Sequence, residues 1–228
     1  MAKKKKAQVT EPTREELSEF AYQPTGAEGL DEGKPFGSQS YKHMKGLLMQ
    51  RVNPSRYVHS ISVAKTARKL ARVYGYDGHI AGLLHDWDKA LLPAQLQQRI
   101  SDFDLKVSPD VINGMPWVLH GPTAAAVLRR DFPCFGEEVF QAIERHTVGA
   151  PDMAPLDMIV FVADKIEPTH DVAEYKRLYK QIGTMSLEEL FYAVLKEGMS
   201  YLVRAGKPIS YDSVTVWNCY NGAKPQEQ

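Results

Sequence analysis

Apolar residues recur at helical spacing along most of the chain after residue 40. Between Arg56 and Tyr74 they step by three and four, and Gly75 then supplies a typical helix end. The expected buried stripe of this segment is Tyr57, Ile61, Ala64, Ala67, Ala71 and Tyr74. Residues 137–147 repeat the spacing and place His146 on their apolar face. Neither a βαβ alternation nor an internal repeat is present, so the pattern predicts an all-α fold, a helical bundle.

Shorter patterns and their boundary residues predict the other helices. A helix over 41–52 is stopped by Asn53-Pro54, and residues 79–85 are almost entirely apolar, as in a helix buried inside a bundle. Ser186 and Glu189 form a capping box that begins a long helix closed by Gly206. Helices are also expected from Pro122 to a break at 131–133, over 155–166 and over 212–220. Residues 91–116 carry three prolines and no strong period, so only short helical pieces are expected there.

Length and charge limit the classes of protein to consider. A chain of 228 residues suits one domain of ordinary size. Lys+Arg and Asp+Glu number 28 each, so no overall field attracts nucleic acid or an anionic membrane. No stretch is long and apolar enough to span a membrane, and Cys134 and Cys219 show no disulfide pattern. We expect a cytoplasmic protein that binds neither nucleic acid nor membranes. The sequence is compatible with a homodimer.

The first 40 residues differ in composition from the rest of the chain. They are rich in Lys, Glu, Gly, Pro, Thr and Ser and show no sustained apolar period. Such a segment cannot bury enough surface to offset the entropy lost on ordering. We therefore interpret residues 1–40 as a flexible, disordered extension and residues 223–228 as a polar tail. The Lys3–Lys6 run is assigned no function.

Six side chains of metal-ligand type lie inside or at the mouth of apolar helical segments. They are His59, His85, Asp86, His120, His146 and Asp164. An imidazole or a carboxylate is unfavourable in apolar surroundings unless something binds it. Neighbouring residues on a helix project about 100° apart, so His85 and Asp86 can reach one site only where their helix ends against it. Mixed nitrogen and oxygen ligation suits iron, manganese or zinc rather than calcium, and this many ligands predicts a two-metal centre.

A two-metal centre suggests a reaction class. Two ions about 3.5–4 Å apart acidify a bridging water and stabilise both the attacking and the leaving oxygen of a phosphoryl displacement. Hydrolysis of a phosphoester or phosphoanhydride is therefore expected. A carboxylate has two oxygens, so it can bridge two such ions while neutral imidazoles fill the remaining ligand positions. Lys89 lies at the same helix end as Asp86, where its ammonium could pair with a substrate phosphate.

Four local strings make the resemblance to a known family specific. They are AGLLHDWDK at 81–89, LHGP at 119–122, RHTVG at 145–149 and VADKIEPTHD at 162–171. In this order they resemble the HD superfamily of metal-dependent phosphohydrolases, and more narrowly its bacterial YqeK-type enzymes. Those enzymes hydrolyse diadenosine tetraphosphate symmetrically to two ADP and carry a di-iron centre. The resemblance covers residues 41–222, which we interpret as a single HD domain.

The resemblance also implies roles for individual residues. His59, His85, Asp86 and Asp164 would hold one ion and Asp86, His120 and His146 the other, so that Asp86 would be the bridging and catalytic carboxylate. Iron is the expected metal, with manganese or zinc as alternatives. The residues implied to border the phosphate pocket of the nucleotide substrate are Lys89, Thr147, Gly149, Glu167, His170 and Asp171. Two positions depart from the family pattern: His170 stands where the family usually has Arg, and Ala150 where a basic residue is common.

These departures leave two alternatives to the leading hypothesis. The first is an HD-domain phosphohydrolase acting on another nucleotide or a phosphomonoester. The second is a non-catalytic, metal-binding regulatory module. Among the aromatic residues, Trp117, Phe132, Phe135, Phe161 and Trp217 are expected in the core, whereas Trp87, beside the metal pair, is a candidate for stacking on an adenine.

Overall fold

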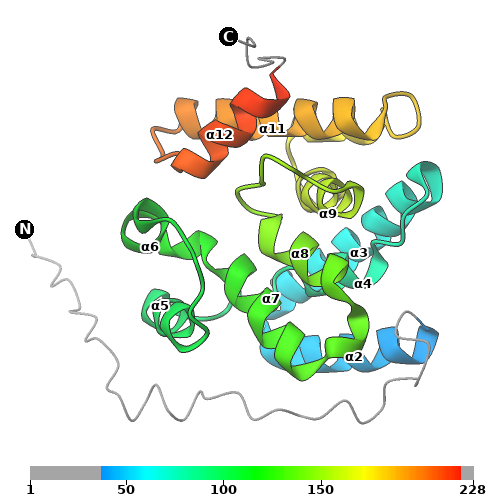
Figure 1. Ribbon diagram of the computed structural model, residues 1–228. Helices are drawn as coiled ribbons and strands as arrows, with labels where there is room; N and C mark the ends of the chain where they lie inside the picture. Colours follow the sequence, from blue (N-terminus) through cyan, green and yellow to red (C-terminus); the bar gives the residue numbers. More distant parts are fainter. Residues whose placement is uncertain (1–36, 222–228) are drawn as a thin grey trace, which may run out of the picture.

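A computed structural model describes residues 37–221 of the chain, and the regular secondary structure in this range is helical, with no β-strand (Figure 1). The all-α prediction is confirmed. Residues 1–36 of the predicted extension and the predicted tail at 223–228 lie outside the described range. In the described range no helix is both long enough and apolar enough to cross a membrane.

The helices follow one another with short connections. They are α2 (Ser38–Arg51), α3 (Pro54–Tyr74), α4 (His79–Leu84), α5 (Pro93–Asp102), α6 (Pro109–Gly114), η1 (Pro116–Val118), α7 (His120–Asp131), η2 (Pro133–Phe135), α8 (Glu137–Arg145), α9 (Pro155–Ile166), α10 (Ala173–Tyr179), α11 (Leu187–Arg204) and α12 (Tyr211–Tyr220), where η marks a 3-10 turn. The predicted helix ends agree with these to within three residues. Helix α10 was not predicted, because its pattern is short.

Local signals in the sequence explain the best-defined ends. The Asn53 side chain accepts a hydrogen bond from the Arg56 backbone N–H and caps α3, whose first residue is a proline. Gly75 ends that helix in the left-handed conformation, with φ of 91°. At the start of α11 the predicted capping box between Ser186 and Glu189 is present in both directions.

Two helices, α4 and α9, form the centre of the molecule. Every residue of α4 after His79 is buried, and α9 is buried on nearly all sides. Helices α2, α3 and α8 pack against α4, and α7 packs against α8, while α3, α8 and α11 pack around α9 (Figure 1). A smaller apolar cluster joins α5, α6 and η1 beside α7. The ends of α3, α4, α7, α8 and α9 consequently meet in the interior.

Two predictions about the core are wrong in part. The buried face of α3 is His59, Ser60, Val63, Ala64, Thr66, Ala67 and Leu70, so it is rotated from the predicted stripe, in which Tyr57 and Ile61 are only half-buried. Phe132, Phe135 and Phe161 are in the core as predicted, and Trp217 is half-buried against it. Trp117, however, is 53% exposed, because it lies on the surface turn η1.

Candidate metal centre

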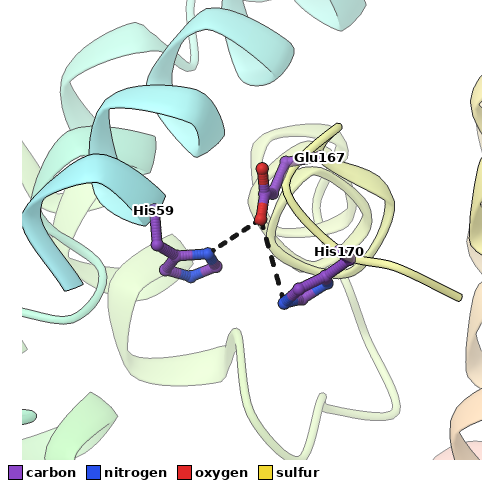
Figure 2. A group of neighbouring side chains, drawn as sticks. All are labelled: His59, Glu167 and His170. Carbon is purple, nitrogen blue, oxygen red and sulfur yellow. Dashed lines mark hydrogen bonds and ion pairs between the residues drawn. The ribbon is translucent and has the colours of Figure 1, made fainter. Parts of the chain in front are cut away.

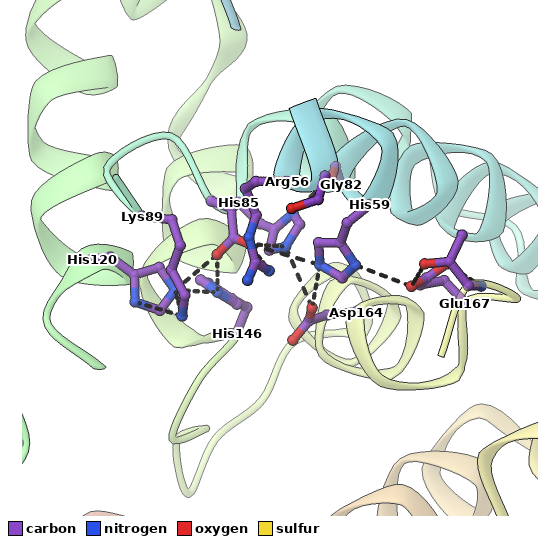
Figure 3. Close-up of polar contacts among 12 residues, drawn as sticks. Arg56, His59, Gly82, His85, Lys89, His120, His146, Asp164 and Glu167 are labelled. Atoms are coloured by element: carbon purple, nitrogen blue, oxygen red, sulfur yellow. Dashed lines mark hydrogen bonds and ion pairs between the residues drawn. The ribbon is translucent and has the colours of Figure 1, made fainter. Parts of the chain in front are cut away.

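The structure brings all six predicted ligand residues together from five helices. Figure 3 labels the four histidines and Asp164 of this cluster. His59 lies in the second turn of α3, and His85-Asp86 follow directly on the last residue of α4. His120 begins α7, His146 follows α8, and Asp164 lies in the last turn of α9. All six are buried. The predicted termination of α4 against the site is therefore confirmed, and it allows His85 and Asp86 to face the same centre.

Asp86 stands in the middle of the cluster, with one carboxylate oxygen toward each half. Its Oδ2 is 3.3 Å from His85 Nε2 and 3.7 Å from His59 Nε2. Asp164 Oδ1 completes this half, 3.0 Å from His59 Nε2 and 3.4 Å from His85 Nε2. Asp86 Oδ1 is 3.0 Å from His120 Nε2 and 3.8 Å from His146 Nε2. The arrangement provides two adjacent donor sets that share one carboxylate.

All four histidine rings are held through Nδ1, so that Nε2 faces the centre. The acceptors of their Nδ1–H groups are Glu167 Oε1 for His59 at 3.0 Å, Gly82 O for His85 at 2.9 Å, Trp117 O for His120 at 2.8 Å and Ile143 O for His146 at 2.6 Å. Such bonds fix the tautomer and orientation of metal-ligating histidines. The buried His85 Nε2 has no hydrogen-bond partner among the described residues. The donor set therefore fits a pair of divalent cations.

The charges in the cluster also suit cation binding. Burial would raise the pKa of Asp86, but His85 and His120 hold it well below its usual range. Burial is the main cause that holds the pKa of His146 well below its usual range, and His85 and His120 lower it further. Burial also lowers the pKa of His120. Burial opposes protonation of His85, yet Asp86 and Asp164 outweigh it and raise its pKa to about 10. The centre thus presents ionised carboxylates that already attract positive charge.

Two glycines allow the ligand-bearing helices to approach closely. A Cβ at Gly121 would lie 3.0 Å from Glu144 O and 3.1 Å from Ile143 O, so the glycine permits α7 to lie directly against the end of α8. That contact places His120 beside His146, with their Nε2 atoms 3.1 Å apart. A Cβ at Gly82 would similarly meet the α3 backbone, 3.2 Å from Ala64 Cα.

Glu167 and His170 form the outer edge of the centre beside His59 (Figure 2). The buried Glu167 carboxylate accepts hydrogen bonds from His59 Nδ1 at 3.0 Å and from the Thr169 backbone N–H at 2.7 Å. Burial opposes its ionisation, but His59 and Thr169 are among the donors that lower its pKa to about 2. The His170 ring stacks against that of His59, with centroids 5.4 Å apart. Glu167 is therefore placed to orient His59.

The other predicted substrate residues differ in how near the centre they lie. Lys89 is half-buried, with Nζ 3.3 Å from His120 Nε2. Thr147 is half-buried and donates to Val118 O at 3.5 Å. Gly149 is buried under Val216 of α12. Asp171 is exposed and pairs with Lys176 at 2.5 Å. Contact of these residues with a substrate stays a prediction.

Sequence reasoning missed two cations that reach the carboxylates. Arg56 Nη1 lies 2.8 Å from Asp86 Oδ2, and Lys165 pairs with Asp164 through its Oδ2. Arg56 is three residues before His59, on the same face of α3, and this spacing was the signal that could have identified it.

The hypothesis that Trp87 stacks on a base is wrong: this side chain is 1% exposed and packs edge-on against Phe132 in the core.

A cavity of about 530 Å³ opens beside the centre. Lys165, His170 and Thr147 line it, and they belong to the segments that carry Asp164 and His146. Its other walls come largely from η1, α10 and α11 and include Trp117, Tyr175, Tyr201, Leu195 and Leu202. A volume of this size suits a small ligand, and its mainly apolar and aromatic walls suit a ring system.

Comparisons with known proteins place these observations in a family. The model of the HD domain family matches residues 56–169. A protein of Staphylococcus aureus named symmetrical bis(5'-nucleosyl)-tetraphosphatase is 29% identical over 181 residues, which are 78% of this chain and 92% of that protein. A protein of Halalkalibacterium halodurans with the same name is 30% identical over 185 residues, 76% of this chain and 95% of the relative.

A solved structure extends the similarity to the fold. It is a crystal structure titled as a predicted HD superfamily hydrolase involved in NAD metabolism, from Clostridium acetobutylicum. It superposes with a TM-score of 0.75 at 27% sequence identity and covers 82% of this chain and 100% of the other. The resemblance inferred from the four sequence strings is confirmed. The chain belongs to the HD domain family and is a homologue of bacterial proteins named symmetrical bis(5'-nucleosyl)-tetraphosphatase.

Proposed function

We propose that this protein is a metal-dependent hydrolase that cleaves diadenosine tetraphosphate symmetrically to two ADP. The observation that carries the proposal is the position of Asp86, whose two oxygens face two adjacent sets of buried nitrogen and oxygen donors. The names of the relatives, which this chain matches over more than nine-tenths of their length, support the choice of substrate. Iron is the expected metal, from the resemblance, with manganese or zinc as alternatives.

In the proposed site the six buried residues would hold two divalent ions. His59, His85 and Asp164 form one set, His120 and His146 the other, and Asp86 belongs to both. Two such ions supply Lewis-acid stabilisation of phosphate charge and a water acidified to near neutrality. The Nδ1 atom of each histidine is already hydrogen-bonded, which fixes the ring with Nε2 toward the centre before the ions bind.

The reaction adds one water to the central phosphoanhydride. The water oxygen forms a bond to one of the two inner phosphorus atoms, the bond from that phosphorus to the central bridging oxygen breaks, and the second ADP departs with that oxygen. Lys89 and Lys165 lie beside the two donor sets, where their ammonium groups could neutralise the phosphate chain. The adjoining cavity, walled by Trp117, Tyr175 and Tyr201, could receive one adenine ring.

Product analysis tests the proposal. Purified protein loaded with ferrous iron under anaerobic conditions is incubated with diadenosine tetraphosphate, and the nucleotides are separated by ion-exchange chromatography. ADP as the sole product supports symmetric cleavage, whereas AMP with ATP, or no turnover, contradicts it. Asp86→Asn should abolish turnover, because it removes the shared charge. Asp102→Asn, the same change at an exposed position, should leave turnover intact.

A second candidate substrate class follows from the cavity lining. His170 supplies an imidazole where the family usually has a guanidinium, so the phosphate end of the cavity carries less fixed positive charge. Another nucleotide or a phosphomonoester needs fewer cationic contacts than a tetraphosphate chain. A panel of dinucleoside polyphosphates, nucleotides and phosphomonoesters, compared by kcat/KM, separates the two. Highest kcat/KM on a substrate other than diadenosine tetraphosphate would favour the second class.

A further inference from the structure

A second cleft, between α2, α3 and the start of α4, concentrates positive charge outside the metal centre. Its volume is about 630 Å³. Five cations line it, Lys45 from α2 and Lys65, Arg68, Lys69 and Arg72 from α3, against one acid, Asp77. The whole chain carries no net charge, so this concentration is local. No residue of the ligand cluster lines the cleft.

Most of these lysines and arginines are not neutralised by direct pairing with an acidic side chain. The four on α3 fall at i, i+3, i+4 and i+7, so they share one exposed face of the helix and repel one another. In the described part of the chain, Lys45, Lys65, Arg68 and Arg72 form no ion pair with a carboxylate. Lys69 differs from them, since its ammonium lies 4.0 Å from the Tyr179 ring centroid.

The far wall of the cleft is flat and aromatic. Tyr41 and His79 stack there with ring centroids 4.0 Å apart and planes inclined by 13°. Burial lowers the pKa of His79, and Arg68 and Arg72 lower it further despite the opposing charge of Asp77. The wall is therefore exposed to the positive potential of α3. His79 is also the first residue of α4, the helix that ends at His85-Asp86.

We propose that this cleft is a second phosphate-binding site that takes a small ligand with a chain of two or more phosphates, such as a nucleoside polyphosphate. Several Lys and Arg side chains converging from two helices match a short polyanion, because each can form charge-assisted hydrogen bonds with phosphate oxygens. A volume of about 630 Å³ is that of a small-ligand cleft. The Tyr41–His79 pair offers a face for a base. The proposal does not depend on the reaction at the metal centre.

Calorimetric titration with inorganic tripolyphosphate tests the proposal. The full chain is first treated with a chelator, so that tripolyphosphate cannot bind through metal ions. We expect one saturable binding event that weakens with added salt. Amide NMR shifts should change at Gly78, His79 and the second half of α3. Absence of binding, or shifts confined to the surroundings of His146 and Lys165, would overturn the proposal.

The double substitution Lys65→Glu/Arg68→Glu is the decisive variant. It reverses the charge of the cleft, yet places each new glutamate four residues before a cation, Lys69 and Arg72, an arrangement that stabilises a helix. The variant should fold, as judged by circular dichroism, and raise the Kd for tripolyphosphate at least about tenfold. Unchanged affinity in the folded variant would overturn the proposal.

A matched control variant distinguishes binding at this cleft from a general effect of the protein's net charge. Lys180→Glu/Lys196→Glu changes the net charge by the same amount at exposed positions outside the cleft. The affinity of this variant for tripolyphosphate should equal that of the unchanged protein. An equal loss of affinity in both variants would reduce the effect to bulk electrostatics and overturn the proposal.

ATP, titrated in parallel, tests whether the aromatic wall of the cleft binds a base. Tighter binding of ATP than of tripolyphosphate supports a base contact at Tyr41 and His79, whereas weaker binding overturns the nucleotide assignment.

Discussion

Asp88 anchors the turn that carries the central ligands, and replacing it should destabilise the protein strongly. Its carboxylate is fully buried and pairs with Arg51 Nη2 at 2.7 Å and with Arg99 Nη1 at 2.5 Å. Arg51 also donates from Nε to Trp87 O at 2.7 Å. These bonds connect α2 and α5 to the turn at 85–89, which holds His85, Asp86 and Lys89. We therefore expect Asp88 to position the metal ligands.

The magnitude follows from the burial of the partners. Removing one member of a buried ion pair costs about 3–5 kcal/mol, because the remaining charge stays desolvated. The side chains of Arg51 and Arg99 are 15% and 13% exposed and can recover some hydration, so the lower end applies to Asp88→Ala. A loss of about 3 kcal/mol corresponds to a fall in Tm of roughly 6–12 °C for a domain of this size. Asp88→Asn retains an acceptor oxygen, so it should lose less.

Thermal unfolding followed by circular dichroism measures both variants. The double variant Asp88→Ala/Arg99→Ala should lose less free energy of unfolding than the two single losses together, because it also removes an unpaired guanidinium. A fall in Tm below about 2 °C for Asp88→Ala, or strict additivity in the double variant, would refute the reasoning. The metal content of the folded Asp88→Ala protein should also decrease, which a purely local packing role would not produce.

Three further predictions concern the metal centre. Glu167→Gln should weaken metal affinity about 10–100-fold, because His59 loses its carboxylate partner; a competition titration against a chromogenic chelator checks this, and unchanged affinity would contradict it. Gly121→Ala should cost about 1–3 kcal/mol in urea unfolding, because its Cβ meets Glu144 O, whereas Gly46→Ala, with nothing within 4 Å of the new Cβ, should not destabilise the protein. Chelation should lower Tm, and metal should restore it, because ions bind only the folded state; equal Tm with and without metal would count against a resident centre.

The sequence predicted the helices and the convergence of the ligands well for a physical reason. His146 and Asp164 each continue an apolar stripe, so the period that defines the helix also directs the polar group inward. His85-Asp86 end a fully apolar helix, which limits where both can point. Both signals, the apolar stripe and the end of the apolar helix, depend only on neighbouring residues, so tertiary contacts did not change them.

What the sequence could not supply depends on contacts between distant segments. Trp117 is apolar but falls on a surface turn in a proline-rich stretch without a period, so nothing local indicated its exposure. Trp87 neighbours a ligand in the chain but points away from it, into the core. The Arg56–Asp86 contact joins α3 to the end of α4, so the spacing of Arg56 from His59 indicated a shared helix face but not the carboxylate that Arg56 reaches.

The central claim is that six side chains hold a pair of ions, and anomalous diffraction from crystals of the metal-loaded protein tests it most directly. The account predicts two anomalous peaks per chain, roughly 3.5–4 Å apart, with one oxygen of Asp86 bound to each ion. Elemental analysis of the same protein should give two metal ions per chain. A single peak, or two peaks without Asp86 between them, would contradict the account.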